Sequence, residues 1–187
     1  MFAPAPILET DRLILRAPEP EDFEPWAAFA ADEETMRHLG GAQARSVAWR
    51  GLCTVRGAWA IRGFSMFSVI EKSTGRWVGR LGPWQPEDWP GTEVGWGLSR
   101  DTWGKGYATE GARACMDYVF DVLGWTDAIH TIEPANVGSQ AVARRLGSTL
   151  RGPVTMPAPY QDTYVEAWGQ TREQWLAARE QRRAAAP

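Results

Sequence analysis

Hydrophobic positions change period along this chain, and the changes predict where helices and strands lie. Residues 7–16 alternate between hydrophobic and polar side chains, which predicts a first strand. Beyond Pro20, which a helix tolerates in its first turn, hydrophobic residues recur at helical offsets from Phe23 to Ala30. A second helix ending at Gly63 is predicted by the same spacing at Ala48, Leu52, Val55 and Trp59.

The middle of the chain predicts a hairpin and another strand. Residues 64–71 and 76–82 are rich in β-forming side chains and flank Lys-Ser-Thr-Gly, a turn sequence. A loop containing proline and tryptophan follows at 83–91, and residues 92–99 predict the next strand.

A long amphipathic helix follows, at about residues 106–123. The remaining predicted elements are a strand at 127–133, a helix at 136–146 ended by Gly147, strands at 148–154 and 163–169, and a polar helix at 171–183. The strand, helix and strand from 92 to 133 should form a right-handed crossover with parallel strands. The pattern therefore predicts an α/β fold (α+β, mixed sheet) in which helices flank about seven strands.

Length and composition favour one domain. The 187 residues are 44% hydrophobic, enough for a substantial core, and we expect a single domain at 1–187 with its core at about 7–170 and a C-terminal helix and tail at 171–187. A formal charge of −3 and a pI near 5.5 argue against direct nucleic-acid binding.

Cysteine use and the first residues predict a cytoplasmic protein. Cys53 and Cys115 are far apart, and residues 1–10 lack the pattern of a secretory signal. No apolar run approaches the roughly 20 residues that cross a bilayer, so we expect no membrane partner. The separated His38 and His130 give no metal-ligand spacing, so no metal is expected.

The chemistry of the chain is concentrated at residues 93–109, where a strand containing Gly95 and Gly97 leads through a glycine turn into the long helix. Unpaired amides and the positive dipole at a helix start attract a phosphate, and Gly104 and Gly106 lack the β-carbons that would block its approach. The strand glycines indicate either a ligand beside the strand or space for Trp84, Trp89 or Trp96.

Two common phosphate-binding motifs do not fit this segment. The third glycine position of a dinucleotide-binding fingerprint is occupied by Arg100. A P-loop requires serine or threonine after its lysine, whereas Gly106 follows Lys105.

Three segments resemble the RimJ/RimL-type branch of the GNAT N-acetyltransferase superfamily. Residues 103–110, Trp-Gly-Lys-Gly-Tyr-Ala-Thr-Glu, resemble its acetyl-CoA pyrophosphate loop. Asn-Val-Gly-Ser at 136–139 with Arg-Arg-Leu-Gly at 144–147 resembles a second motif, and residues 8–16 are similar to its first strand. The resemblance covers nearly the whole chain and implies a GNAT-like fold.

The chain departs from the family pattern at two positions. Ser148 stands where a phenylalanine is usual, and Ala143 replaces a tyrosine that protonates the thiolate in many GNAT enzymes. The resemblance implies that Ser139 contacts the coenzyme sulfur, although a serine there could simply satisfy backbone donors at a helix start. Tyr160 and Tyr164 are reserve acids.

The resemblance also implies the site and its co-substrate, acetyl-CoA. The implied binding residues are Trp96, Gly97, Leu98, Trp103, Gly104, Lys105, Gly106, Tyr107, Ala108, Thr109, Asn136 and Ser139. The amide of Leu98 would polarise the acetyl carbonyl, and Arg100, Arg144 and Arg145 could join Lys105 in screening the phosphates. Glu93, on the same side of its strand as Gly95 and Gly97, would act as a base through water, unless it is only a solvated or ion-paired carboxylate.

The implied acceptor is a primary amine, on a small molecule or at a peptide N-terminus. An α-amine, with a pKa of about 7.7–8.0, is partly neutral near pH 7.5, whereas only roughly one lysine in 10³ is. Trp84, Trp89, Trp96 and Trp103 could line the acceptor pocket, or cover the sheet and a contact between two copies in a homodimer. A non-catalytic acyl-CoA sensor and an interaction domain are the alternative functions.

Overall fold

Eight strands form one mixed sheet, in the order β1-β2-β3-β4-β5-β6-β8-β7, in the computed structural model, which describes residues 5–184. The strands are β1 (Leu8–Glu9), β2 (Leu13–Arg16), β3 (Phe67–Glu71), β4 (Trp77–Trp84), β5 (Glu93–Leu98), β6 (Asp127–Ile132), β7 (Thr149–Val154) and β8 (Val165–Thr171). The α-helices are α1 (Phe23–Ala31), α2 (Glu33–Met36), α3 (Arg45–Arg62), α4 (Tyr107–Asp121), α5 (Val137–Leu146) and α6 (Arg172–Ala184). Two short 3₁₀ turns are η1 (Pro20–Asp22) and η2 (Arg100–Thr102).

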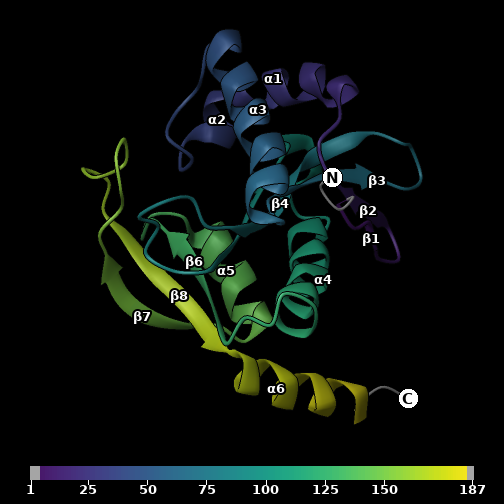
Figure 1. The fold of residues 1–187 in the computed structure, drawn as a ribbon, viewed down its shortest axis with the longest axis vertical. Coiled ribbons are helices and arrows are strands. Elements are labelled where there is room, and N and C mark those ends of the chain that lie inside the picture. The colour runs from purple at the N-terminus through teal and green to yellow at the C-terminus, as the bar shows by residue number, and fades with distance from the viewer. Residues whose placement is uncertain (1–4, 185–187) are drawn as a thin grey trace.

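The expected parallel crossover is confirmed. β5 and β6 run parallel on either side of α4 in the chain, with Glu93 opposite Ile129, and β3 and β4 form the expected hairpin. Helices α1, α2 and α3 lie together at one end of the molecule and α6 lies at the other (Figure 1). The tail expected after α6 extends into residues 185–187, which lie outside the described residues, as do residues 1–4.

The expectation of one strand over residues 7–16 is wrong, because the chain reverses within it. β1 and β2 are antiparallel, with Leu8 opposite Leu15. Thr10 forms the turn: its amide donates to the Leu13 carbonyl, and its Oγ1 accepts from the Leu13 amide, both at 3.0 Å. Since this turn contains neither glycine nor proline, the alternation continues through it without a visible break. The sheet therefore has eight strands rather than about seven.

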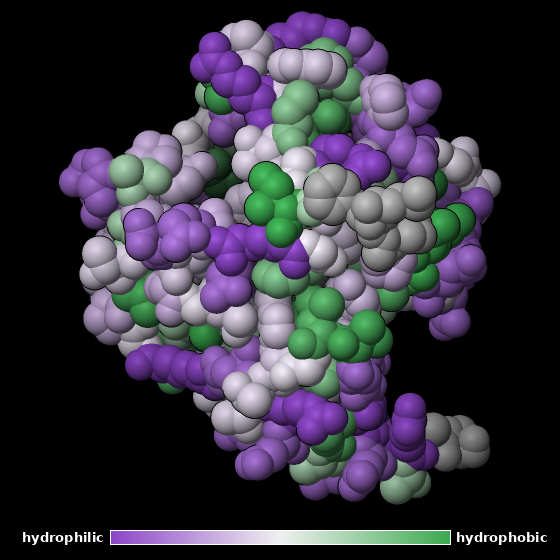
Figure 2. Space-filling model, in the orientation of Figure 1, coloured by the Kyte–Doolittle hydropathy of each residue, from purple (hydrophilic) through white to green (hydrophobic). Residues whose placement is uncertain are grey.

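The sheet has a hydrophobic core on each face. Leu13 and Leu15 of β2 belong to a cluster with α4, whereas Ile14, pointing the other way, packs against the cluster built by α1 and α3. Gly111 allows α4 to approach β4, because a β-carbon there would stand 2.6 Å from Leu81 Cδ2. In Figure 2, hydrophilic residues spread over the visible face, with hydrophobic residues in smaller groups between them.

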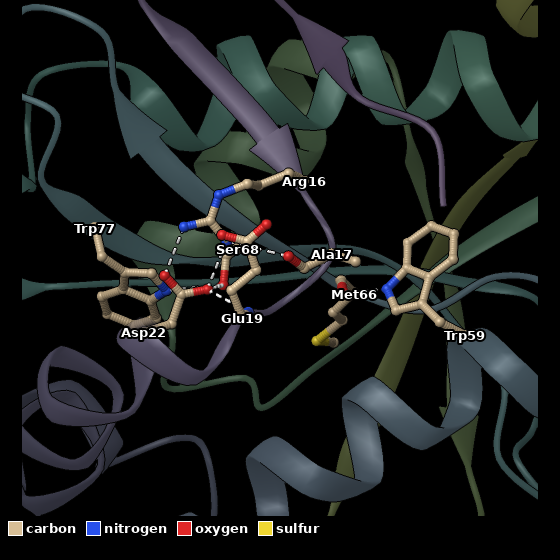
Figure 3. A network of polar contacts seen from close by, with 8 residues as sticks. All are labelled: Arg16, Ala17, Glu19, Asp22, Trp59, Met66, Ser68 and Trp77. Atoms are coloured by element: carbon tan, nitrogen blue, oxygen red, sulfur yellow. Dashed lines mark hydrogen bonds and ion pairs between the residues drawn. The ribbon is translucent and has the colours of Figure 1, made fainter. Parts of the chain in front are cut away.

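A buried carboxylate joins the first strands to η1 (Figure 3). Asp22 accepts hydrogen bonds from Arg16 at 2.7 and 2.8 Å, from Ser68 Oγ at 2.7 Å and from the Glu19 amide at 2.9 Å. Burial alone would raise the pKa of Asp22, but these donors hold it below its usual value. Removing one partner of such a pair typically costs about 3–5 kcal/mol, so this network fixes the start of α1 against the sheet.

No helix within residues 5–184 combines the length and the apolar character needed to cross a lipid bilayer.

Candidate functional site

The site begins where β5 and β6 separate. Their register contains one pair, Glu93 with Ile129, and β5 then continues alone on that side to Leu98. On its other side β5 is paired with β4, where Leu98 stands opposite Gly79. The next residue, Ser99, donates its amide to the Val78 carbonyl at 2.9 Å. Because bonded and non-bonded pairs alternate in an antiparallel ladder, the amide of Leu98 points away from β4, toward the opening.

The glycine turn lies at the end of this strand. Gly104 and Gly106 adopt positive φ angles of 76° and 82°, and a β-carbon on Gly104 would meet nothing within 4 Å. Gly106 is the N-cap of α4 and supplies no side-chain cap. The Lys105 amide donates to the Thr102 carbonyl at 3.4 Å, but the Gly104 and Gly106 amides donate to no backbone carbonyl within the described chain. The turn therefore presents open amide donors at a helix start.

Arg12, in the turn between β1 and β2, holds this loop from the side. Its Nη1 donates to the Lys105 carbonyl at 2.9 Å, and its Nε donates to Glu110 Oε2 at 2.6 Å. Glu110 also accepts from Thr10 Oγ1 at 2.6 Å. Burial would raise the pKa of Glu110, yet these donors hold it below its usual value. The first turn of α4 is thus tied to the opening hairpin of the chain.

The second motif forms the opposite wall. Asn136 caps α5 by accepting from the Ser139 amide at 3.0 Å. The Ser139 hydroxyl is free for another role, and it accepts from Trp96 Nε1 at 3.2 Å. The Asn136 side chain, not that of Ser139, therefore caps this helix start. Capping of backbone donors consequently does not explain the Ser139 hydroxyl.

A cavity of about 1090 Å³ extends between these elements. The residues predicted from the sequence that line it are Trp96, Gly97, Leu98, Trp103, Gly104, Gly106, Tyr107, Ala108, Thr109, Asn136 and Ser139. Lining residues that the sequence does not predict include Arg12, Thr35, His38, Leu39 and Arg113. Nothing in the local sequence marks these residues, since they come from a turn, from α2 and its end, and from an exposed position of α4.

Two predicted site residues, Glu93 and Lys105, do not line the cavity. Lys105 contributes its carbonyl to Arg12, and its ammonium lies 5.9 Å from the centre of the Tyr107 ring. Of the arginines expected near the phosphates, Arg145 lines the cavity, whereas Arg144 lies over the Trp168 ring and Arg100 is outside the lining.

Glu93 is 5% exposed and is held by three protein donors. Its carboxylate accepts from Trp89 Nε1 at 2.5 Å and from the amide and hydroxyl of Thr131 at 3.0 Å. Burial raises the pKa of Glu93, while these hydrogen bonds and the nearby Arg80 oppose the rise. The description of Glu93 as a solvated or ion-paired carboxylate is wrong, since it is buried and forms no ion pair within residues 5–184.

The strand glycines make room for Met66, for Phe29 of α1 and for Leu39 in the turn after α2, rather than for tryptophans. A β-carbon at Gly95 would stand 3.0 Å from Met66 Cε, and one at Gly97 would stand 3.0 Å from both Phe29 Cζ and Leu39 Cδ1. Trp96 and Trp103 line the cavity, but Trp84 and Trp89 do not. Tyr160 packs against Trp89, and Tyr164 is exposed, so neither reserve acid borders the cavity.

The arrangement fits acetyl-CoA. The open glycine turn suits a diphosphate, and the unpaired edge of β5 suits a peptide-like pantetheine arm. The volume of about 1090 Å³ lies just above the roughly 300–1,000 Å³ typical of ligand pockets.

Comparison with known proteins identifies the family. Residues 12–149 match the acetyltransferase (GNAT) domain. The N-acetyltransferase p20 of Bacillus licheniformis is 30% identical over 148 residues, which cover 78% of this chain and 83% of p20. YkkB of Bacillus subtilis is 38% identical over 87 residues. That match covers 46% of this chain and about half (51%) of YkkB.

A solved structure agrees over nearly the whole chain. The acetyltransferase from Agrobacterium tumefaciens superimposes with a TM-score of 0.79 at 28% identity, over 91% of this chain and 96% of that one. The chain therefore belongs to the GNAT family of acetyl-CoA-dependent N-acetyltransferases.

Proposed function

We propose that the chain is a RimJ/RimL-type enzyme that transfers an acetyl group from acetyl-CoA directly to a primary amine, on a small molecule or at a peptide N-terminus. One observation carries this proposal: a single cavity joins the open amides of the Gly104–Gly106 turn to the unpaired edge of β5 and to Ser139. A diphosphate at the turn would place the thioester beside Leu98.

The bound co-substrate supplies a thioester carbonyl, which is open to attack by an amine. The Leu98 amide is proposed to donate to the oxygen of that carbonyl; loss of one such donor has cost roughly 10²–10³ in rate elsewhere. Ser139 is proposed to protonate the departing sulfur. Cys53 and Cys115 are absent from the cavity lining, and burial raises the pKa of the Cys115 thiol, which supports direct transfer over an acyl-cysteine route.

Glu93 is proposed to accept a proton through water. Its raised pKa brings it closer to the operating pH, which suits a general base. A water molecule is required because the carboxylate does not border the cavity.

The acceptor class rests on the chemistry of amines. A spermidine N-acetyltransferase from Vibrio cholerae shares the fold, with a TM-score of 0.71 at 16% identity. Polyamines are therefore tested beside N-terminal peptides, whose less basic amines need less help from a base.

The deciding experiment measures thiol release from acetyl-CoA with glycinamide, spermidine and a peptide starting with alanine as acceptors. Release that depends on an amine, with the acetyl amide found by mass spectrometry, supports the proposal. Saturable acetyl-CoA binding without turnover across a wider amine panel would favour a sensor. An absence of coenzyme binding would favour an interaction domain.

A further inference from the structure

The turn after α2 brings a histidine to the reacting end of the cavity. α2 is capped by Asp32, which accepts from the Thr35 amide at 2.8 Å. Two amides, those of Leu39 and Gly41, then donate to the Met36 carbonyl at 2.9 Å and close the turn that carries His38. The backbone at His38 is therefore held on both sides.

This turn rests on β5 next to the proposed oxyanion donor. Leu39 Cδ1 lies 3.0 Å from the place where a Gly97 β-carbon would be, and Gly97 precedes Leu98. His38, Leu39, Gly97, Leu98 and Ser139 all line the one cavity. The imidazole thus belongs to the same space as the groups proposed to act on the thioester.

Glu133 fixes the orientation of the His38 ring. The His38 Nδ1 lies 2.7 Å from Glu133 Oε2, and both side chains are largely buried, with 21% and 25% of their surfaces exposed. The Glu133 carbonyl accepts from the Asn136 amide at 2.8 Å, so the same residue also holds the start of α5. With Nδ1 engaged, Nε2 is the remaining nitrogen, and it forms no hydrogen bond within residues 5–184.

We propose that His38, oriented by Glu133, is a catalytic residue that takes the proton from the acceptor ammonium through Nε2. A carboxylate that holds one ring nitrogen of histidine favours the tautomer in which the other nitrogen is free to accept a proton. This inference rests on the proposed function and adds the group that contacts the amine.

The proton balance of the step is complete. An ammonium nitrogen loses one proton to His38 Nε2, and its lone pair then forms the C–N bond to the acetyl carbon. As the C–S bond breaks, the electron pair leaves on sulfur, and a second proton from the nitrogen reaches that sulfur, with Ser139 as the carrier. One proton is released for each acetyl group transferred, and it leaves by way of His38.

His38 and Glu93 would act in series rather than in competition. Glu93 accepts from Thr131 near the end of β6, and Glu133, which holds His38, lies two residues further along the chain. His38 is the first acceptor because it borders the cavity, and Glu93 is a second acceptor reached through water.

The test uses the full chain, acetyl-CoA and whichever of the three amines defined above the parent acetylates. His38→Ala should lower kcat about 10²-fold while changing the acetyl-CoA dissociation constant less than twofold. Added imidazoles should restore turnover of His38→Ala in proportion to their basicity. Glu133→Gln should lower kcat about tenfold without rescue, because the ring is present but loosely oriented. Arg37→Gln, an exposed neighbour outside the cavity lining, is the control.

The outcomes separate this inference from the proposed function. A parent that acetylates none of the amines tested contradicts the proposed function, and His38 loses its role with it. If the parent acetylates an amine and His38→Ala retains full kcat, only the role of His38 is overturned. A folded His38→Ala with low kcat that no imidazole restores also overturns it, since that result indicates a structural role. His38→Gln, which retains a hydrogen-bonding side chain, replaces alanine if the alanine variant does not fold.

Discussion

Trp96 Nε1 donates a hydrogen bond to Ser139 Oγ across 3.2 Å, and so links β5 to the first turn of α5. The two residues are 43 positions apart, and both line the cavity. The Trp96 ring also packs against His130, with ring centres 4.8 Å apart. The hydrogen bond holds the Ser139 hydroxyl beside the edge of β5, where the coenzyme sulfur is proposed to lie.

Ser139→Ala should lower kcat roughly tenfold and leave the acetyl-CoA dissociation constant nearly unchanged. The effect is modest because a departing thiol has a pKa near 8.5 and needs little help to leave, so water can partly replace the hydroxyl. Steady-state kinetics and calorimetric binding measure the two quantities, with the exposed Ser46→Ala as control. Equal kcat values for parent and variant would remove Ser139 as the acid.

Gly106→Val should raise the acetyl-CoA dissociation constant at least about tenfold. Valine at a φ of 82° strains the turn, and its side chain enters the space between the turn and Arg12, whose Nη2 lies 3.5 Å from the β-carbon position. Gly75→Val is the matched control, because Gly75 has a φ of 70° and lies in the open turn between β3 and β4. Both variants should lose about 1–2 kcal/mol of stability, but only Gly106→Val should lose affinity. Equal acetyl-CoA affinities for the parent and Gly106→Val would contradict the proposal that the Gly104–Gly106 turn binds the diphosphate.

Glu93→Gln should reduce turnover most at low pH while coenzyme affinity stays nearly intact. Burial raises the pKa of Glu93, so the parent itself loses the active carboxylate at a higher pH than an ordinary glutamate would. Within the range where Glu93 is still ionised, amines are most fully protonated at the acidic end, and a base is needed most there. Profiles of kcat from pH 6 to 9 test this, with Glu87→Gln as the exposed control. Unchanged turnover across the range would exclude Glu93 as a proton acceptor.

His130 should make folding sensitive to mild acid. Burial lowers the pKa of His130 from 6.5 to about 4. Between pH 6.5 and pH 4, therefore, the unfolded chain binds a proton at His130 and the folded chain does not. The stability that depends on neutral His130 is complete above pH 6.5 and is lost as the pH falls toward 4, by about 3 kcal/mol in total. Urea unfolding of the parent and His130→Gln over this pH range should show that the difference between their free energies of unfolding shrinks on acidification. A difference that stays constant with pH would contradict the lowered pKa of His130.

His130 also gives a structural reason for the serine at position 148. Its Nδ1 donates to the Val94 carbonyl at 2.7 Å, and its Nε2 accepts from Ser148 Oγ at 2.9 Å. Gln170 Nε2 in turn donates to Ser148 Oγ at 2.9 Å. Ser148, which stands where the resemblance implies a phenylalanine, thus completes a buried polar network with His130 and Gln170. The partners come from distant parts of the chain, so no local pattern predicts this network.

The segments predicted best are those whose periodicity or motif is local. The glycine turn, α4 and the crossover from β5 to β6 follow from glycine positions and from one amphipathic helix. The hairpin of β1 and β2 is not predictable from the local pattern, because its turn residue is Thr10, whose hydrogen bonds to Leu13 replace the usual glycine or proline.

The sequence predicts site residues that lie within a motif. It does not predict those that only the tertiary fold brings to the cavity. Arg12 and His38 reach the cavity from the first hairpin and from the end of α2, and each is held by a partner about a hundred positions away, Glu110 and Glu133. Such pairings depend on how the sheet and helices pack, which periodicity does not encode.

The most direct measurement is a crystal structure of the full chain with coenzyme A. We expect the diphosphate oxygens to accept hydrogen bonds from the Gly104 and Gly106 amides and the first amides of α4, and the sulfur to lie beside Leu98 and Ser139. Coenzyme bound elsewhere, or with its sulfur remote from β5, would contradict the assignment of this cavity and the acetyl-transfer mechanism derived from it.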